Sequence, residues 1–332
     1  MSGYIIRRVA YTVTVLIAVS IFGFIIIELP PGDFVSTKVA QLEATGQRVN
    51  QEMVDALRLQ YGLDKPVYLR YLTWMRRLVS GSPGMSLDWN RPVMELILER
   101  LPLTILLTGA TLIFTYLVAI PIGIYSATHQ YSLGDYTFTA LGFIGLATPN
   151  FLLALILMYL LFKLFGISIG GLFSLEYARA EWSLAKLLDM LGHLVAPVVV
   201  IGTAGTAWLI RVMRASLLDE LRKQYVITAR AKGVGERSLL FKYPVRIAVN
   251  PIVSTVGWLL PVIVSGEVIT ALVLSLPTTG PLLLRALQAQ DMYLAATIVI
   301  FLTVLTVIGT LLSDLLLAWL DPRIRFEAQA GA

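Results

Sequence analysis

Six long apolar stretches are the feature of this 332-residue sequence that most limits its possible folds. A helix needs about 20 apolar residues to cross the roughly 30 Å hydrocarbon core of a bilayer, and each stretch is that long. Lipid offers peptide groups no hydrogen-bond partners, so such stretches must be helical. The predicted spans are about Val9–Leu29, Leu103–Ala127, Thr137–Phe165, His193–Met213, Ala248–Leu274 and Leu294–Leu320.

The amino-acid composition excludes several other common protein classes. Charged residues make up 14% of the chain, whereas a soluble domain carries about 25%. This difference excludes a disordered chain, a collagen-like chain and an ordinary cytosolic enzyme. A β-barrel would need short alternating segments, and these runs are continuous. The first run is too long for a signal-peptide core, so we interpret it as an uncleaved signal anchor.

The distribution of lysine and arginine predicts the orientation, because these residues favour cytoplasmic loops. With the N-terminus inside, the inner stretch 211–246 carries nine of them, and arginine pairs flank the first and last spans. The two short outer loops carry only three. The loop at 30–102 also carries nine, but loops of that length are translocated largely regardless of charge. Both termini are therefore expected in the cytoplasm.

The outer loop at 30–102 is predicted to contain two amphipathic helices. Asn50 is a suitable N-cap for the first, about Gln51–Gln60, and Gly62 suits its end. The second should begin at Pro66, a good first helical residue, and stop before the glycines from Gly81 onward. Two compatible interpretations stay open, namely a lid on the helix bundle and a docking platform for an external partner.

The inner loop at 214–247 is predicted to form a helix, a glycine break and a second helix. Apolar residues follow helical spacing before Gly233 and Gly235, and a short apolar stretch, Ser238–Tyr243, precedes Pro244. A solvated linker would not expose so many apolar residues in register. They should either pack on the spans of this chain or dock on a cytoplasmic subunit.

Several chemistries are excluded by the residue types present. The chain has no cysteine and two histidines, so thiolate metal sites, cysteine nucleophiles and histidine clusters are excluded. It has no GxxxxGK[ST] motif for binding ATP, and a Ser-His-Asp arrangement is implausible because both histidines flank or enter membrane spans. We therefore expect no enzyme, no catalytic or metal-binding residue, no cofactor held by this chain and no nucleic-acid partner.

Four motifs, in order along the chain, carry a resemblance to a known family. They are Arg7-Arg8 before the first span with Pro31-Gly32-Asp33 after it, Tyr61-Gly62-Leu63-Asp64-Lys65-Pro66, the segment Tyr225–Gly233, and the closing Asp321-Pro322-Arg323-Ile324-Arg325. Through them nearly the whole chain resembles the permease subunits of binding-protein-dependent ABC importers. It is most similar to the oligopeptide/dipeptide/nickel branch.

The resemblance implies an all-α integral membrane protein with the type I ABC importer permease fold. It has six transmembrane helices and a helical extracytoplasmic insertion after the first. The expected divisions are a signal-anchor span at 1–29, the insertion at 30–102, a five-span core at 103–325 that contains the loop 214–247, and a cytoplasmic tail at 326–332. The expected location is the cytoplasmic (inner) membrane of a bacterium or archaeon.

The resemblance also implies partners and a division of labour. A second permease subunit, expected to form a heterodimer although an identical one stays open, would complete the path. Two ATPase domains would bind ATP and Mg, and an extracytoplasmic solute-binding protein would deliver the solute. The helix before Gly233 would be a coupling helix in a cleft of the ATPase. The matching residues are Tyr225, Thr228, Ala229, Arg230, Ala231, Lys232, Gly233 and Arg237.

Polar residues inside the spans are candidates for the translocation path, because polar groups in lipid should face a cavity or a partner. Glu267 is predicted to line the path or its gate, with an interhelical hydrogen-bonding role as the alternative. Asn150 and Thr270 are further path candidates. Asp314 and Pro149, which breaks the third span, are predicted to be structural.

Two stripes of small residues are predicted to be packing seams rather than binding sites. One lies in the fourth span and the other in the sixth. They comprise Gly202, Thr203, Gly205 and Thr206, and Thr303, Thr306, Thr310 and Ser313.

The solute is the least constrained part of the prediction. A short peptide is expected, with an oligosaccharide, nickel or an opine as alternatives. The chain departs from the branch at Ala229-Arg230-Ala231, Arg246-Ile247-Ala248, Ala271 and Leu276–Gly280. A secondary transporter driven by an ion gradient is the alternative from another class, but it would favour internal repeats with broken helices. A non-transporting scaffold is disfavoured by the polar residues within the spans.

Overall fold

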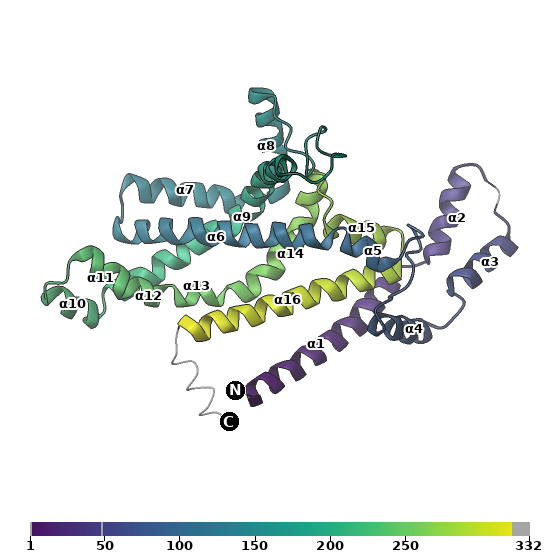
Figure 1. The fold of residues 1–332 in the computed structure, drawn as a ribbon, viewed down its shortest axis with the longest axis horizontal. Helices are drawn as coiled ribbons and strands as arrows, with labels where there is room; N and C mark the ends of the chain where they lie inside the picture. The colour runs from purple at the N-terminus through teal and green to yellow at the C-terminus, as the bar shows by residue number, and fades with distance from the viewer. Residues whose placement is uncertain (1, 48, 321–332) are drawn as a thin grey trace. The chain divides into compact units, whose positions relative to one another are not determined.

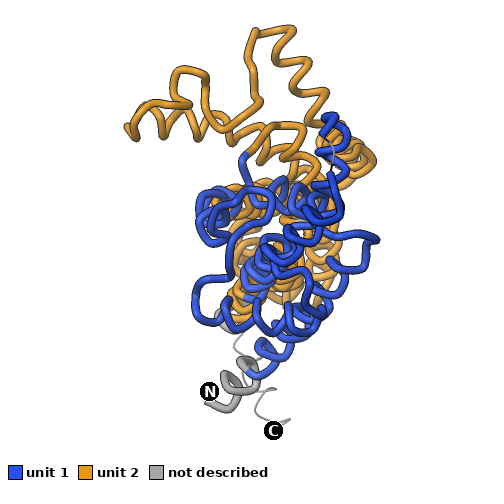
Figure 2. Tube along the Cα trace, turned by 90° about the vertical axis from the view of Figure 1, so that its right-hand side faces the viewer, with its two compact units in different colours: residues 1–104, 277–307 blue, residues 105–276, 308–332 orange. Residues whose placement is uncertain are grey.

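The computed structural model describes residues 2–47 and 49–320, and for residues 2–9, 265–267 and 317–320 it describes the backbone alone. The chain divides into two compact units. Unit 1 comprises residues 1–104 and 277–307, and unit 2 comprises residues 105–276 and 308–332 (Figure 2).

The described residues form sixteen α-helices and no β-strand, so the predicted all-α fold is confirmed (Figure 1). The helices are α1 (Ser2–Glu28), α2 (Phe34–Ala44), α3 (Gln51–Tyr61), α4 (Val67–Val79), α5 (Val93–Leu98), α6 (Leu101–Thr128), α7 (Leu133–Ala147), α8 (Asn150–Phe165), α9 (Leu184–Leu221), α10 (Gln224–Ala231), α11 (Glu236–Lys242), α12 (Pro244–Ala248), α13 (Asn250–Ser254), α14 (Val256–Val273), α15 (Thr279–Gln288) and α16 (Met292–Leu320).

Four helical segments are long and apolar enough to cross a membrane without a break. They are Ala10–Glu28, Val93–Thr128, Leu184–Leu221 and Met292–Leu316. Two further candidates are bent pairs, Leu133–Ala147 with Asn150–Phe165 and Glu236–Ser254 with Val256–Val264. Counting each bent pair as one span gives six, the predicted number, although the second pair begins at Glu236 and the predicted fifth span begins at Ala248.

The third predicted span is broken, as expected at Pro149, and the helix that contains the fourth is longer than predicted. α7 and α8 meet at a bend of 108°, because Pro149 cannot donate a backbone hydrogen bond and holds Thr148 in an extended conformation. α9 has 38 residues, which at 1.5 Å per residue makes it about 57 Å long. It therefore exceeds the thickness of the hydrocarbon core.

Unit 1 joins α1 to the helices of the 30–102 segment through a buried aromatic cluster. Phe24 of α1 lies 5.5 Å from the rings of both Tyr71 and Trp74 of α4. The indole of Trp74 is fully buried and donates a 3.0 Å hydrogen bond to Thr297 of α16. The segment is therefore packed against both the first and the last span.

Both helices predicted in this segment are confirmed. The Asn50 side chain accepts a 3.0 Å hydrogen bond from the amide of Met53 and caps α3, and Gly62 ends that helix with a φ of 68°. Pro66 precedes the first turn of α4. Prediction missed α2, whose N-cap is Asp33, because Pro30–Asp33 was interpreted only as a turn.

A buried carboxylate holds the 86–88 loop of unit 1 against the start of α16. Asp291 is fully buried and accepts hydrogen bonds from the Ser86 hydroxyl at 2.5 Å and from the Leu87 amide at 2.7 Å. Its other oxygen accepts from the amide of Leu294 and caps α16. Burial raises the pKa of Asp291, against the lowering effect of these donors.

Unit 2 is arranged around α9, which packs against α7, α8, α12 and α14. Small residues allow these close approaches. A β-carbon at Gly202 would lie 2.8 Å from the ring of Phe114 on α6, and one at Gly145 would lie 2.5 Å from the methyl group of Thr203. The predicted packing role is confirmed for Gly202, Thr203 and Gly205 of this stripe.

The C-terminal part of the sixth-span stripe, Thr310 and Ser313, is also a packing seam. The Ser313 hydroxyl donates a 3.2 Å hydrogen bond to the carbonyl of Val253. A β-carbon at Gly257 would lie 3.1 Å from the methyl group of Thr310. α16 therefore contacts the α13–α14 segment through small and hydroxylated side chains.

Replacing Gly123 by alanine should destabilise the protein, because the new β-carbon would lie 2.5 Å from Cβ of Met213 and 3.2 Å from the carbonyl oxygen of Ile210. Overpacking of this kind costs about 1–3 kcal/mol. The same change at Gly109 on the same helix would meet open space. Thermal unfolding in detergent should show a lower Tm for G123A than for G109A. Equal Tm values would show that α6 and α9 are not packed this closely.

Candidate coupling hairpin and translocation path

The most distinctive surface element of unit 2 is the helical hairpin formed by α10, residues 232–235 and α11, here called the coupling hairpin. Gly233 has a φ of 78°, a backbone conformation that favours glycine. The amide of Gly233 donates to the carbonyl of Arg230, and the amide of Val234 donates to that of Ala229. This pair of bonds is a Schellman motif, which ends α10 and turns the chain sharply.

A small core holds the two helices of the hairpin together. Val226, Ala229 and Leu239 are buried against one another, and Tyr225, Val234 and Tyr243 pack around them. Part of the apolar surface that the sequence places in this loop is therefore covered within the hairpin itself. The remainder is exposed, including Ile227 at 48% and Phe241 at 55%.

Polar contacts fix the hairpin to the end of α9. The Tyr225 hydroxyl donates a 2.6 Å hydrogen bond to Glu220, and the Lys223 ammonium lies 2.8 Å from the other oxygen of the same carboxylate. Burial and the adjacent Glu220 carboxylate raise the pKa of Tyr225. The tyrosine therefore remains a neutral donor at physiological pH.

The eight predicted coupling residues divide into an inner and an outer group. Tyr225 and Ala229 face the hairpin core. Arg230 is exposed, and its guanidinium already pairs with Glu236 at 2.5 and 3.0 Å across the turn. The remaining exposed residues are Thr228, Ala231, Lys232, Gly233 and Arg237.

A second anchor of α9 was missed by sequence reasoning. Arg214 makes a bidentate contact with Asp135 at 3.2 and 3.0 Å, and the same carboxylate accepts a bond from the amide of Tyr131. Asp135 is buried. The pair ties α9 to the 131–135 turn, just before the hairpin begins. The local signal in the sequence is a single aspartate three residues after the N-cap Ser132.

The residues predicted for the translocation path lie on neighbouring helices of unit 2. Asn150 is the first residue of α8 and Thr270 lies in α14, and these two helices pack together. Thr270 is buried. The backbone of Glu267 belongs to α14, but its side chain lies outside the described residues. Roles in the path remain predictions for all three.

The two residues predicted to be structural lie at different kinds of position. Pro149 stands at the bend between α7 and α8, immediately before the first turn of α8. Asp314 is partly buried within α16. The bend agrees with the predicted effect of Pro149, whereas the role of Asp314 remains a prediction.

Buried threonines on three helices of unit 2 were not predicted as a group. Their hydroxyls have no hydrogen-bond partner among the described residues, although an unpaired buried hydroxyl costs about 1–3 kcal/mol. The sequence indicates part of this group on α6, where three threonines recur at helical spacing. The threonines are Thr108, Thr111, Thr115, Thr206 and Thr270.

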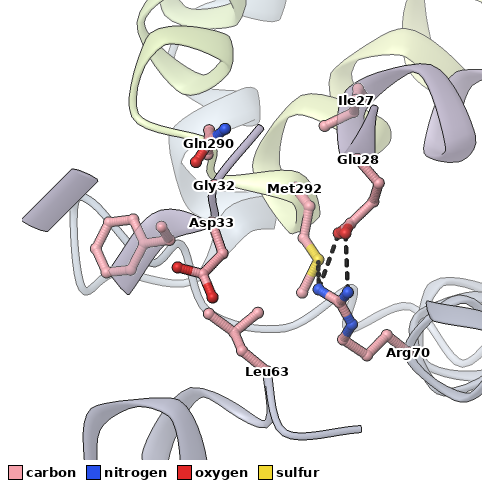
Figure 3. A pocket seen from close by; sticks show the side chains of 9 residues that line it. Ile27, Glu28, Gly32, Asp33, Leu63, Arg70, Gln290 and Met292 are labelled. Atoms are coloured by element: carbon pink, nitrogen blue, oxygen red, sulfur yellow. Dashed lines mark hydrogen bonds and ion pairs between the residues drawn. The ribbon is translucent and has the colours of Figure 1, made fainter. Parts of the chain in front are cut away.

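A small pocket in unit 1 lies where α1, α2, α4 and α16 meet (Figure 3). Glu28 and Arg70 form a two-pronged ion pair at 3.0 and 2.8 Å, and the same guanidinium contacts the sulfur of Met292. Asp33 accepts bonds from Ser36 and Arg58. The charged groups of the pocket are paired internally, so the pocket stabilises the unit instead of offering open ligands.

Two further observations concern chemistry at these sites. The residues that the structure describes contain no group of three or more His, Asp or Glu side chains placed to hold a metal ion.

At Asp33, burial alone would raise the pKa of the carboxyl, but hydrogen bonds from Ser36 and the charge of Arg58 outweigh this effect and lower the pKa.

These features define an all-helical, multi-pass membrane protein with a helical hairpin displayed at the end of its longest helix. Comparison with known sequences agrees. Residues 119–326 match the family described as the binding-protein-dependent transport system inner membrane component, and residues 1–108 match the N-terminal part of such membrane components.

Several relatives match over nearly their full length. The chain is 34% identical to the oligopeptide transport system permease protein AppB of Bacillus subtilis over 332 residues, which cover 98% of this chain and 100% of the relative. It is 29% identical to the dipeptide transport system permease protein DppB of Alkalihalophilus pseudofirmus, at the same coverage. It is 30% identical to the peptidoglycan transport system permease protein YejB of Agrobacterium fabrum, covering 98% and 99%.

The chain belongs to the binding-protein-dependent transport system inner membrane component family, and it is the permease subunit of an ABC importer. Membership of this family implies that an ATPase and a solute-binding protein are its partners. The resemblance drawn from the four motifs is thereby confirmed.

Replacing Asp33 by alanine should lower the unfolding free energy by about 1 kcal/mol at neutral pH, because α2 loses its N-cap. The folded pKa of Asp33 lies below the ordinary aspartate value of 3.8. Its contribution is therefore complete above about pH 3.8 and is lost as the pH falls through the lowered value. Thermal unfolding of D33A and the wild type at pH 7 and near pH 3 should show a Tm difference that shrinks in acid.

The matched control is D64A, which removes an exposed aspartate in the turn after α3. Surface changes of this kind usually alter stability by less than about 0.5 kcal/mol. A Tm difference for D33A that is independent of pH would contradict the assignment of the lowered pKa to the capping carboxylate.

Proposed function

We propose that this chain forms half of the translocation path of an ATP-driven importer of short peptides. In this proposal the coupling hairpin transmits ATP-driven movements of the ATPase subunits to α9 and the spans packed around it. ATP and Mg would be bound by those subunits, because this chain has no ATP-binding motif.

The observation that carries the proposal is the surface of the coupling hairpin. The hairpin has its own small core and is fixed to α9 through Glu220. It still exposes the apolar side chains of Ile227 and Phe241 and the cationic side chains of Lys232 and Arg237. A folded element that exposes apolar side chains beside cations is suited to a cleft with an apolar floor and acidic rims.

The proposed assembly has a second permease subunit, different from this one, two ATPase domains and an extracytoplasmic binding protein. Both termini of this chain and the coupling hairpin would be cytoplasmic, and the 30–102 segment would lie outside. The charge distribution supports this orientation, because the 211–246 stretch carries nine lysines and arginines.

A peptide is the proposed solute because relatives that span the whole chain are named oligopeptide and dipeptide permeases. The unpaired hydroxyls of α6, α9 and α14 support a path that opens between these helices. Hydroxyls both donate and accept hydrogen bonds, so they suit the amide groups of peptides of differing sequence.

Uptake by the reconstituted importer tests the proposed solute. Vesicles that contain this chain with its genomic partners and external binding protein should accumulate labelled di- to pentapeptides when ATP is enclosed. Accumulation of an oligosaccharide or nickel without peptide would reject the peptide assignment but keep the importer. Accumulation driven by an ion gradient without ATP would reject both.

Replacing Gly233 by valine should weaken the transmission of movement between the ATPase and the spans. A β-branched residue at a φ of 78° costs about 1–2 kcal/mol and strains the turn. Gly235 has an ordinary φ of −59° and open space around it, so G235V is the matched control. Binding-protein-stimulated ATPase activity and uptake should fall in G233V and persist in G235V. Normal values of both quantities in G233V would contradict the coupling role.

Single-cysteine labelling should show that Lys232 and Lys65 lie on opposite sides of the membrane. The chain has no cysteine, and both lysines are exposed. A membrane-impermeant maleimide should label K65C from the outside of intact cells, and should label K232C only after the membrane is opened. The reverse pattern would overturn the proposed orientation.

A further inference from the structure

Helix α4 of unit 1 carries an uncovered apolar stripe beside its buried face. Trp74 is fully buried, and Tyr71, Met75 and Leu78 pack into the same core. The stripe next to this face consists of Tyr68, Leu72 and Val79, which are 64%, 58% and 82% exposed. These three residues have the helical spacing i, i+4 and i+11, so they line one side of the helix.

The other side of α4 is mostly polar. Thr73 and Arg77 are exposed there, whereas Arg76, four residues after Leu72, lies at the edge of the stripe beside the exposed Leu69. The apolar arc is therefore wider than the core of unit 1 covers. A helix with a broad apolar arc and arginines on the other side is the pattern of a helix that lies in a membrane surface.

The contacts of α4 with α1 fix its depth relative to the membrane. The Tyr71 hydroxyl lies 2.9 Å from the hydroxyl of Ser20, and Arg70 pairs with Glu28. Ser20 and Glu28 are eight positions apart on α1, a distance of about 12 Å along the helix axis. Because Ala10–Glu28 is a candidate membrane span, α4 packs beside the final two turns of that span.

The side of α1 near this end also carries uncovered apolar residues. Phe22, Ile26 and Leu29 are 64%, 62% and 71% exposed, as expected for a helix whose outer side faces lipid. α4 packs against the same stretch of α1 through Tyr71 and Trp74, so its stripe and these α1 residues lie near the same end of the span. A soluble partner would have to enter the lipid boundary to cover the stripe.

We propose that α4 is an interfacial helix, whose Tyr68–Leu72–Val79 stripe inserts among the phospholipids of the leaflet at the Glu28 end of α1. Arg76 and Arg77 then face the phosphate groups and water. Such an insertion would hold the 30–102 segment flat on the membrane surface. This insertion requires that α1 crosses the membrane, and it does not depend on the solute or on the coupling role of the hairpin.

Depth measurements on the complete importer in phospholipid nanodiscs test this inference. Because the chain lacks cysteine, L72C can be labelled with a fluorophore, with R77C, which is exposed on the other side of α4, as the matched control. We expect lipids that carry a nitroxide on the acyl chain to quench the label at Leu72 more strongly than the label at Arg77. A water-soluble quencher should show the reverse order.

A second comparator, L59C, separates lipid insertion from apolarity alone. Leu59 is 67% exposed on α3, which has no contact with the end of α1 like that of α4. Its label should respond to the aqueous quencher. Equal aqueous quenching of the Leu72 and Arg77 labels would overturn the proposal. So would protection of the Leu72 label from both quenchers, which would indicate a protein partner, or protection only after the external binding protein is added.

Discussion

The whole architecture depends on the absence of hydrogen-bond partners in lipid. This constraint makes each apolar run helical, and it requires every polar group near the membrane to find a partner within the protein. The pairs Arg214–Asp135 and Arg70–Glu28 are two results of this requirement. Where the helical pattern fails, the chain bends, as at Pro149 between α7 and α8. Unpaired threonine hydroxyls of α6, α9 and α14 depart from this requirement, and the proposed path is placed between these helices for that reason.

α9 connects the membrane-spanning part of unit 2 to the coupling hairpin. It packs against several helices of unit 2, in part through small residues. Its C-terminal end is held by Arg214–Asp135 and by the Glu220 contacts with Lys223 and Tyr225. Close packing makes such an element respond as a rigid body, because well-packed interfaces shift between discrete arrangements and do not deform gradually. A displacement of the hairpin would therefore move α9 and the helices packed on it together, which is how the proposed coupling would work.

Much of this could be predicted from local sequence signals. Apolar run length located the spans, Asn50 and Gly62 located α3, and Gly233 located the turn of the hairpin. Contacts between distant parts of the chain could not be predicted in this way. Nothing near Asp291 indicates that it binds the 86–88 loop, and the partner of Asp135 lies far away at Arg214. The small core of the hairpin was missed for the same reason, since Val226 and Leu239 meet only after Gly233 turns the chain.

The central claim is that an ATPase subunit grips the coupling hairpin in the intact importer, and site-directed cross-linking tests it most directly. Thr228 is exposed on α10, so T228C can carry a short photoactivatable cross-linker without disturbing the hairpin core. The account predicts a covalent product with the ATPase subunit whose yield changes when ATP is added, and no such product from a cysteine on the α3–α4 turn. A freely labelled T228C that gives no ATPase adduct in the assembled, transport-active complex would contradict it.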